Sequence, residues 1–155
     1  MSDQKDAHVP DDEREIAYCG LYCKDCFLRK GEIADMARDL RKALRDEKFT
    51  KMHKGLSKYF KELENYETCY ETLGALVKFR CKKSCKDGSG NPFCKIRKCA
   101  IKKGYDGCWE CGDYKDCRLF DSLKEVHGEA TTKNLNKLKG KGKEEFLNGS
   151  KHYVL

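Results

Sequence analysis

The sequence predicts a mainly α-helical fold with irregular cysteine-rich loops, organised as one small domain. The chain has 155 residues, a length that suits a single domain. Between residues 32 and 79 apolar side chains recur at intervals of three and four, a spacing typical of helices. Ten of the eleven cysteines lie in short groups outside that helical insert. We therefore expect about three central helices, cysteine-rich loops around them in sequence, and one helix after the last cysteine.

Composition divides the chain into three parts. Residues 1–15 carry six acidic side chains against two basic ones and are expected to form a flexible acidic arm. Residues 16–127 are expected to form the folded domain. Residues 128–155 are rich in lysine, asparagine and glycine, so we expect a flexible basic tail. A short helix containing Leu135 and Leu138 is the alternative within this tail.

Three helices are expected near residues 32–46, 49–63 and 65–79. The apolar positions of each segment share one helix face because they are three or four residues apart. They are Ile33, Met36, Ala37, Leu40, Ala43 and Leu44, then Phe49, Met52, Leu56, Tyr59, Phe60 and Leu63, then Tyr66, Cys69, Tyr70, Leu73, Leu76 and Val77. Cys69 is alone on the third stripe and is interpreted as a core residue. The last helix is expected to begin near Arg118.

Charge and hydropathy point to a particular compartment and class of partner. The formal net charge is +7, and residues 81–120 carry ten basic side chains against five acidic ones. The sequence begins with a polar, acidic stretch that does not resemble a secretory signal. No run of about 18 apolar residues is present. We therefore expect a cytoplasmic protein with no membrane partner, in which cysteines stay reduced.

Ten cysteines fall into four groups with short spacing. They are Cys19-x3-Cys23-x2-Cys26, Cys81-x3-Cys85, Cys94-x4-Cys99 and Cys108-x2-Cys111-x5-Cys117. Two thiolates separated by two to four residues can bind one ion from a single turn, as they do in structural zinc sites. All ten cysteines are therefore candidate metal ligands, and residues 81–117 are the cysteine-rich part of the predicted domain.

Zinc is the metal that this pattern favours. Leu, Ile, Val and Phe make up only about 19% of the chain, so a core alone is a weak source of stability. Zinc takes four ligands, and ten thiolates suit about two complete sites, or three sites completed by other residues. An iron–sulfur cluster is the alternative, because four thiolates also hold such clusters. His8, His53, His127 and His152 are scattered and are interpreted as surface residues; the alternative is that one of them completes an unsaturated site.

The first cysteine group also has the C-x3-C-x2-C spacing of radical S-adenosylmethionine enzymes. Those enzymes resemble one another in a barrel of strands and helices that is much longer than this chain. Asp25 also stands where they usually place an aromatic residue. The spacing without its structural context does not predict that chemistry.

Several ordered motifs of the chain extend beyond the cysteine spacing. They are Tyr18-Cys19-Gly20-Leu21-Tyr22-Cys23-Lys24-Asp25-Cys26, Phe93-Cys94-Lys95-Ile96-Arg97-Lys98-Cys99-Ala100, Lys103-Gly104, Cys108-Trp109-Glu110-Cys111 and Cys117-Arg118-Leu119. Together these motifs resemble an uncharacterised prokaryotic cysteine-rich family, domain of unknown function 3795. The resemblance covers about residues 16–123 and implies zinc binding without an established activity. Members similar to this chain usually have a cysteine where Asn91 stands, and they space the pair matching Cys81 and Cys85 by two residues. These departures leave the fourth ligand of that site open.

Three functions are compatible with these patterns. The first is a zinc-stabilised module that binds an acidic partner, either nucleic acid or protein. Its candidate contact residues are Lys95, Arg97, Lys98, Lys102 and Lys103, with Phe93, Tyr105 and Trp109 as rings that stack on bases. The second is a metalloenzyme or redox protein, with Glu110 as the nearest acid. The third is thiol chemistry near Lys and Arg. No Ser/His/Asp order, HExxH, P-loop or GxGxxG motif occurs, so catalysis is not the favoured function.

Overall fold

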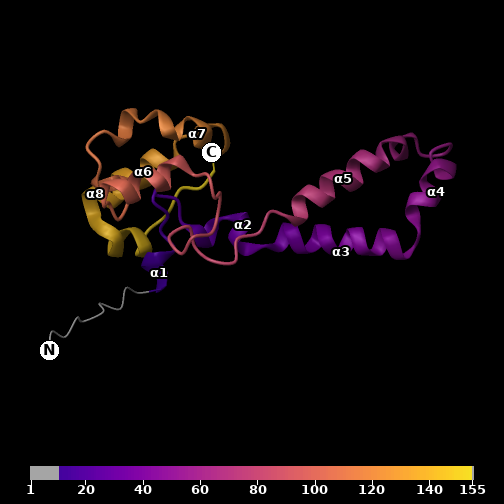
Figure 1. The fold of residues 1–155 in the computed structure, drawn as a ribbon, viewed down its shortest axis with the longest axis horizontal. Coiled ribbons are helices and arrows are strands. Elements are labelled where there is room, and N and C mark those ends of the chain that lie inside the picture. Colours follow the sequence, from indigo (N-terminus) through magenta and orange to yellow (C-terminus); the bar gives the residue numbers. More distant parts are fainter. Residues whose placement is uncertain (1–10, 155) are drawn as a thin grey trace. The chain divides into compact units, whose positions relative to one another are not determined.

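The computed structural model describes residues 11–154 and confirms the mainly helical class (Figure 1). Within these residues the structure has no strand, and a single antiparallel bridge joins Ile16 to Tyr22. The helices are α1 Asp11–Arg14, α2 Phe27–Lys30, α3 Glu32–Asp46, α4 Phe49–Leu56, α5 Tyr66–Val77, α6 Lys95–Lys103, α7 Asp121–His127 and α8 Ala130–Asn148. The short 3-10 turns are η1 Cys23–Asp25, η2 Lys61–Asn65, η3 Cys108–Glu110, η4 Tyr114–Asp116 and η5 Arg118–Phe120. Among the described residues, none of these helices is both long and apolar enough to cross a membrane.

The chain divides into two compact units, which are described separately. The hairpin unit is residues 27–81, and it contains the range expected for a helical insert. Among the described residues, the cysteine-rich unit combines residues 11–26 with residues 82–154. Most of the predicted acidic arm, residues 1–10, lies outside the described residues, whereas its end forms α1.

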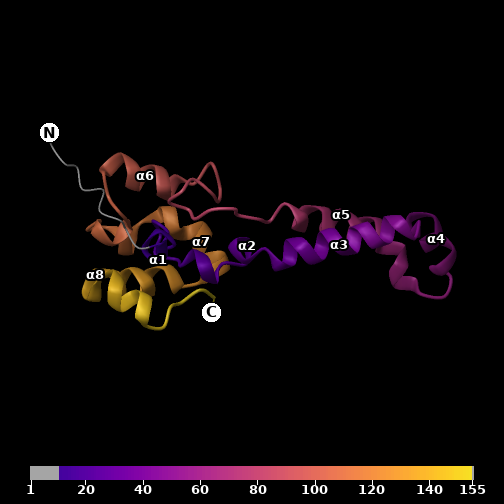
Figure 2. The same cartoon turned by 90° about the horizontal axis from the view of Figure 1, so that it is seen from below.

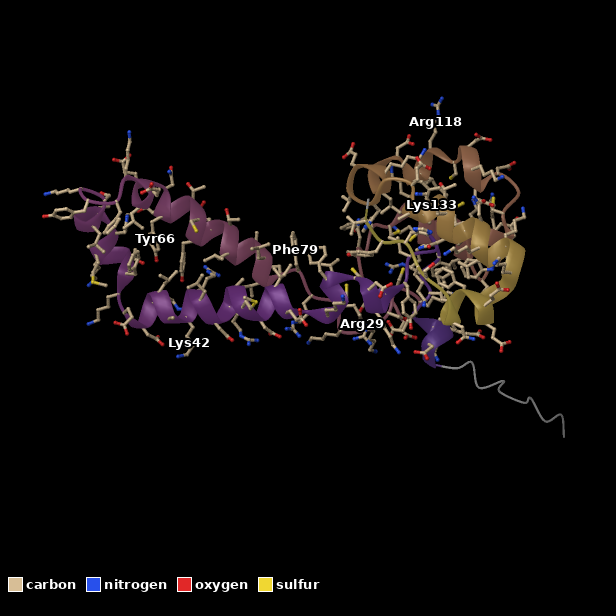
Figure 3. All side chains as sticks on the ribbon, turned by 180° about the vertical axis from the view of Figure 1, so that it is seen from behind. Arg29, Lys42, Tyr66, Phe79, Arg118 and Lys133 are labelled. Carbon is tan, nitrogen blue, oxygen red and sulfur yellow. The ribbon has the colours of Figure 1, made fainter. Side chains whose placement is uncertain are left out.

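In the hairpin unit, α3 and α5 lie side by side, and α4 forms part of the connection between them at the end of the hairpin (Figures 1 and 2). The close packing rests on small residues, because Ala34 and Ala37 are the buried side chains of α3. Tyr66 at the start of α5 stacks on Phe49 at a ring distance of 5.1 Å and on His53 at 4.7 Å. Figure 3 shows Tyr66 pointing into the hairpin, where these rings form its small core.

Two residues of this unit differ from the sequence prediction. His53 is buried rather than on the surface, because it packs under the ring of Tyr66. Cys69 is exposed, so its interpretation as a core residue is wrong. The reason is that α5 packs mainly against α3 and buries only one side of a stripe that the sequence pattern treats as fully covered.

The predicted helix boundaries hold for α3 and differ for the second helix. The range 32–46 agrees with α3, and the third helix ends at Val77 rather than residue 79. The second helix stops at Leu56 instead of continuing to residue 63. Gly55 lies in its last turn, where glycine costs about 1 kcal/mol relative to alanine. The chain leaves the helix there and reaches Phe60 with an extended backbone.

The cysteine-rich unit is built around one apolar core. Its buried members come from the N-terminal segment, α6, the short turns and α8, and they are Ile16, Ile96, Trp109, Tyr114, Phe120, Leu135, Leu138 and Phe146. Partly buried cysteines pack against this core, so the apolar cluster and the thiols form one continuous structure. The arrangement positions the candidate ligands around a folded centre rather than on isolated loops.

The C-terminal segment differs from the predicted flexible basic tail, since residues 130–148 form α8. Leu135, Leu138 and Phe146 enter the core. Gly142, with φ of 84°, breaks the helical geometry between Leu138 and Phe146. The fully buried Asn134 accepts a hydrogen bond from the backbone NH of His152 at 2.9 Å and donates one to its carbonyl oxygen at 2.7 Å. The lysines and glycines of this segment therefore mark the exposed side of a packed helix.

Candidate metal centre

The ten candidate ligands are all free, half-buried thiols, whereas Cys69 is exposed. Nine of the ten belong to the cysteine-rich unit. Cys81 belongs to the hairpin unit, where its backbone NH donates a hydrogen bond of 2.8 Å to the carbonyl oxygen of Leu28. Half-buried thiols suit metal ligands, because a bound ion must reach the sulfur while the surrounding protein excludes most water.

The two C-x2-C segments adopt the same local structure. In each, a 3-10 turn begins at the first cysteine, and the NH of the second cysteine donates to the carbonyl oxygen of the first. The distances are 2.9 Å for Cys26 to Cys23 and 3.1 Å for Cys111 to Cys108. This turn holds two thiols on one short loop, as a zinc-binding loop requires.

Four thiols line one cavity of about 170 Å³, which we call the four-thiol cavity. Its thiols are Cys99, Cys108, Cys111 and Cys117. Cys99 comes from α6, Cys108 is the first residue of the η3 turn, Cys111 directly follows that turn, and Cys117 follows η4. The structure thus brings two of the sequence groups together. The group Cys94–Cys99 contributes one thiol to the cavity, and the group Cys108–Cys117 contributes all three of its thiols.

Burial and mutual repulsion disfavour ionisation of these thiols without a cation. Burial, together with the charges of the neighbouring Cys117 and Cys111, raises the pKa of Cys108 to about 12. The Lys103 Nζ lies 3.9 Å from the Cys111 Sγ, and the charges of Cys111 and Cys99 raise the pKa of this lysine. A bound metal ion reverses such a shift, because it stabilises thiolates directly.

A second set of thiols gathers around Cys19 in the same unit. Burial raises the pKa of Cys19, and the charges of Cys85, Cys94 and Cys108 add to the increase. Burial also raises the pKa of Cys23 to about 11, against a hydrogen bond from the Cys85 backbone. The structure therefore places members of the first three sequence groups near one another. Cys26 neighbours Cys23 in this set.

Arg97 holds the loop that carries Cys85. Its guanidinium donates to the carbonyl oxygens of Ser89 and Asn91, the latter at 2.9 Å, and lies 4.0 Å from the Cys85 Sγ. The backbone NH of Arg97 points to the Cys94 Sγ at 3.5 Å, which caps α6. Arg97 is therefore a structural residue of the thiol loops rather than an exposed contact for a partner.

The structure does not contain a preassembled ion site within residues 11–154. None of their Cys, His, Asp and Glu side chains forms a group of three or more that could hold a metal ion as it stands. The ligand set and the identity of the metal therefore stay predictions.

The predicted contact residues for an acidic partner divide into two classes. Trp109 is buried in the core beneath Lys86, whose Nζ lies 5.1 Å from the ring centre, so this ring is not available for stacking on a base. Lys95, Lys98 and Lys102 are exposed on α6, and Phe93 is exposed just before it. Arg97 and Trp109 are therefore not available as contact residues, and the exposed lysines of α6 form the remaining basic face.

Glu110, the candidate acid next to Cys111 in sequence, is exposed. Its Oε2 accepts a hydrogen bond of 2.8 Å from the backbone NH of Asp106. Asp106 in turn pairs with Lys86 and with Lys143, the latter at 2.5 Å, and Lys143 also reaches Glu13 at 3.3 Å. Sequence spacing could not reveal this ion network, because its members are 20 to 130 positions apart.

Comparison with known proteins supports the resemblance seen in the motifs. A family model described as a protein of unknown function (DUF3795) matches residues 15–122, which is more than half of the chain. Searches of curated proteins and of solved structures found no match. The chain therefore belongs to the family of proteins of unknown function that carry the DUF3795 domain.

Proposed function

We propose that this chain is a zinc-stabilised binding module for an acidic partner. The observation that supports it most is the four-thiol cavity, in which four cysteines from two sequence groups line one small space beside the core. Four thiolates are a complete ligand set for structural zinc. Apolar walls formed by Ile96, Leu119 and Phe120 would shield such an ion from water.

The partner would bind on the exposed side of α6. Cys99 lines the four-thiol cavity, and the buried Ile96 and Ala100 anchor the helix in the core. Lys98 and Lys102 are exposed. In this proposal the metal fixes the helix, and the helix presents lysines and the ring of Phe93 to a nucleic acid or an acidic protein.

Metal content tests the first half of the proposal. Protein purified without added metal is expected to contain zinc and to be colourless. Replacing Cys111 by Ser should remove metal from the four-thiol cavity, while the matched control Cys69→Ser should retain the full amount because Cys69 is exposed on α5. Equal metal content in both variants would show that Cys111 is not a ligand.

The absorption spectrum separates zinc from the alternative. The same four thiols would suit an iron–sulfur cluster, which absorbs visible light and carries electrons. A brown preparation with stoichiometric iron and sulfide would replace the zinc module with a redox protein. Zinc with no visible absorption would support the structural role of the metal.

A further inference from the structure

The end of the hairpin unit carries a dense basic segment that the proposed function does not use. We call residues 48–61 the hairpin tip; it comprises α4 and the turn that follows (Figure 1). The tip has five lysines and no aspartate or glutamate. They are Lys48, Lys51, Lys54, Lys58 and Lys61, all exposed, and none makes an ion pair with any residue in the described part of the chain.

Large apolar side chains are exposed among these lysines. Tyr59 is 82% exposed and Phe60 is 60% exposed. Met52 and Leu56 are also among the exposed apolar residues and lie one helical turn apart on α4. Apolar groups gathered in this way, and rimmed by charge, mark interaction surfaces.

The tip is an ordered structure whose apolar residues face two directions. Phe49 and His53 face inward and pack on Tyr66. After α4, the NH of Phe60 donates to the carbonyl oxygen of Leu56 at 3.0 Å, and the Ser57 hydroxyl donates to that of Lys54 at 2.8 Å. The outward side chains are therefore presented by a folded turn.

We propose that the hairpin tip binds an anionic lipid surface. Lysines attract acidic headgroups, while exposed aromatic and aliphatic side chains enter the boundary between headgroups and acyl chains. This proposal departs from the expectation of no membrane partner, which rested on the lack of a spanning segment, because surface binding requires no membrane-spanning helix. The proposal goes beyond the α6 surface and does not depend on a metal.

Two features favour lipid over single-stranded nucleic acid as the partner of the tip. Met52 and Leu56 contribute apolar area but have no ring to stack on a base. The segment also forms the end of a helical hairpin (Figure 2). Glu62, Glu64 and Glu67 follow the tip and limit the basic surface to α4 and its turn.

Co-sedimentation of the full chain with vesicles tests the proposal. The unmodified protein is expected to bind vesicles of phosphatidylcholine mixed with phosphatidylglycerol and not vesicles of phosphatidylcholine alone. Added salt should weaken binding, because it screens the lysines. The triple variant Lys51→Gln, Lys54→Gln, Lys58→Gln should bind at least about tenfold more weakly, and Tyr59→Ser with Phe60→Ser should reduce binding while keeping the salt dependence.

The matched control is Lys98→Gln with Lys102→Gln on α6, which should bind vesicles as the unmodified chain does. If the proposed role of α6 is wrong, the protein will not bind its acidic partner through α6, but vesicle binding by the hairpin tip will be unchanged. Circular dichroism should show the same helicity in all variants, since the changed side chains are exposed. Three results would overturn the proposal. The unmodified protein could fail to bind anionic vesicles at low salt, or the triple variant could bind them equally well. The tip could also bind single-stranded RNA while the protein binds no vesicles.

Discussion

The backbone NH of Cys108 donates a hydrogen bond of 2.8 Å to the carbonyl oxygen of Tyr18. This bond joins the last cysteine group to the first, although the two are separated by the whole hairpin unit in sequence. Trp109 follows immediately and is buried in the same core. Changes at the thiols are therefore transmitted to the packing around Trp109.

Metal removal should expose Trp109, because this residue lies between two candidate ligands. It is the only tryptophan of the chain, so tryptophan fluorescence reports on this position alone. When metal ligands fold together with the surrounding core, losing the ion loosens that core. Adding a strong chelator is expected to shift tryptophan fluorescence to longer wavelength, and zinc should restore it. An unchanged emission spectrum after complete metal loss would show that the core around Trp109 stays folded without the metal.

Gly107→Ala should strongly destabilise the cysteine-rich unit. A Cβ at this position would lie 2.0 Å from the ring of Trp109, which is too close for any heavy atoms that are not bonded. Overpacking of this kind lowers the free energy of unfolding by about 1–3 kcal/mol or more. The matched control is Gly112→Ala, where a Cβ would meet no atom within 4 Å. Urea unfolding of the two variants measures the difference.

Leu138→Ala tests whether the C-terminal helix belongs to the core. Leu138 is buried in the cluster, and truncating a buried leucine lowers the free energy of unfolding by about 2–5 kcal/mol. Ile101→Ala on α6 is the control, because Ile101 is exposed and its loss should change stability by about 0.5 kcal/mol or less. A similar small effect for Leu138 would favour the flexible tail that composition predicts.

The sequence predicts the helical class and α3 well because their signals are local. Apolar spacing over a full helix identifies α3, and short cysteine spacing identifies the turn at Cys108 and Cys111. Prediction from the sequence fails where tertiary packing decides whether a segment is buried. The lysine- and glycine-rich composition of α8 hides its buried leucines. The partners of each thiol also depend on contacts between segments that spacing cannot reveal.

The basic residues of α6 show the same limit, and a pair of substitutions separates their roles. Arg97→Gln should lower the free energy of unfolding by about 1.5–3 kcal/mol, because the guanidinium hydrogen bonds that hold the loop at Ser89 and Asn91 are lost. Lys98→Gln should leave stability unchanged. It should instead weaken binding to single-stranded RNA and reduce the salt dependence of that binding, as measured by fluorescence anisotropy. Destabilisation by Lys98→Gln would contradict its exposed position.

Asp106 gives the stability of the cysteine-rich unit a predictable dependence on pH. Burial raises the pKa of its carboxyl, but hydrogen bonds from Lys143 and Lys86 outweigh burial and leave the pKa below its ordinary value of 3.8. A carboxyl whose pKa is lower in the folded chain stabilises the fold above its unfolded pKa. That stabilisation is lost as the pH falls through the lowered folded value.

The variant Asp106→Asn should therefore be less stable than the unmodified protein at neutral pH, because Lys86 and Lys143 lose their shared carboxylate. The difference should be constant down to about pH 4 and shrink below it, as the unmodified Asp106 becomes protonated too. Both proteins carry the same thiols, so the loss in acid of the metal proposed here would affect both and cancel in the comparison. Urea unfolding across this pH range measures the difference, and a difference that persists unchanged in strong acid would show that the ion network contributes no charge-dependent stability.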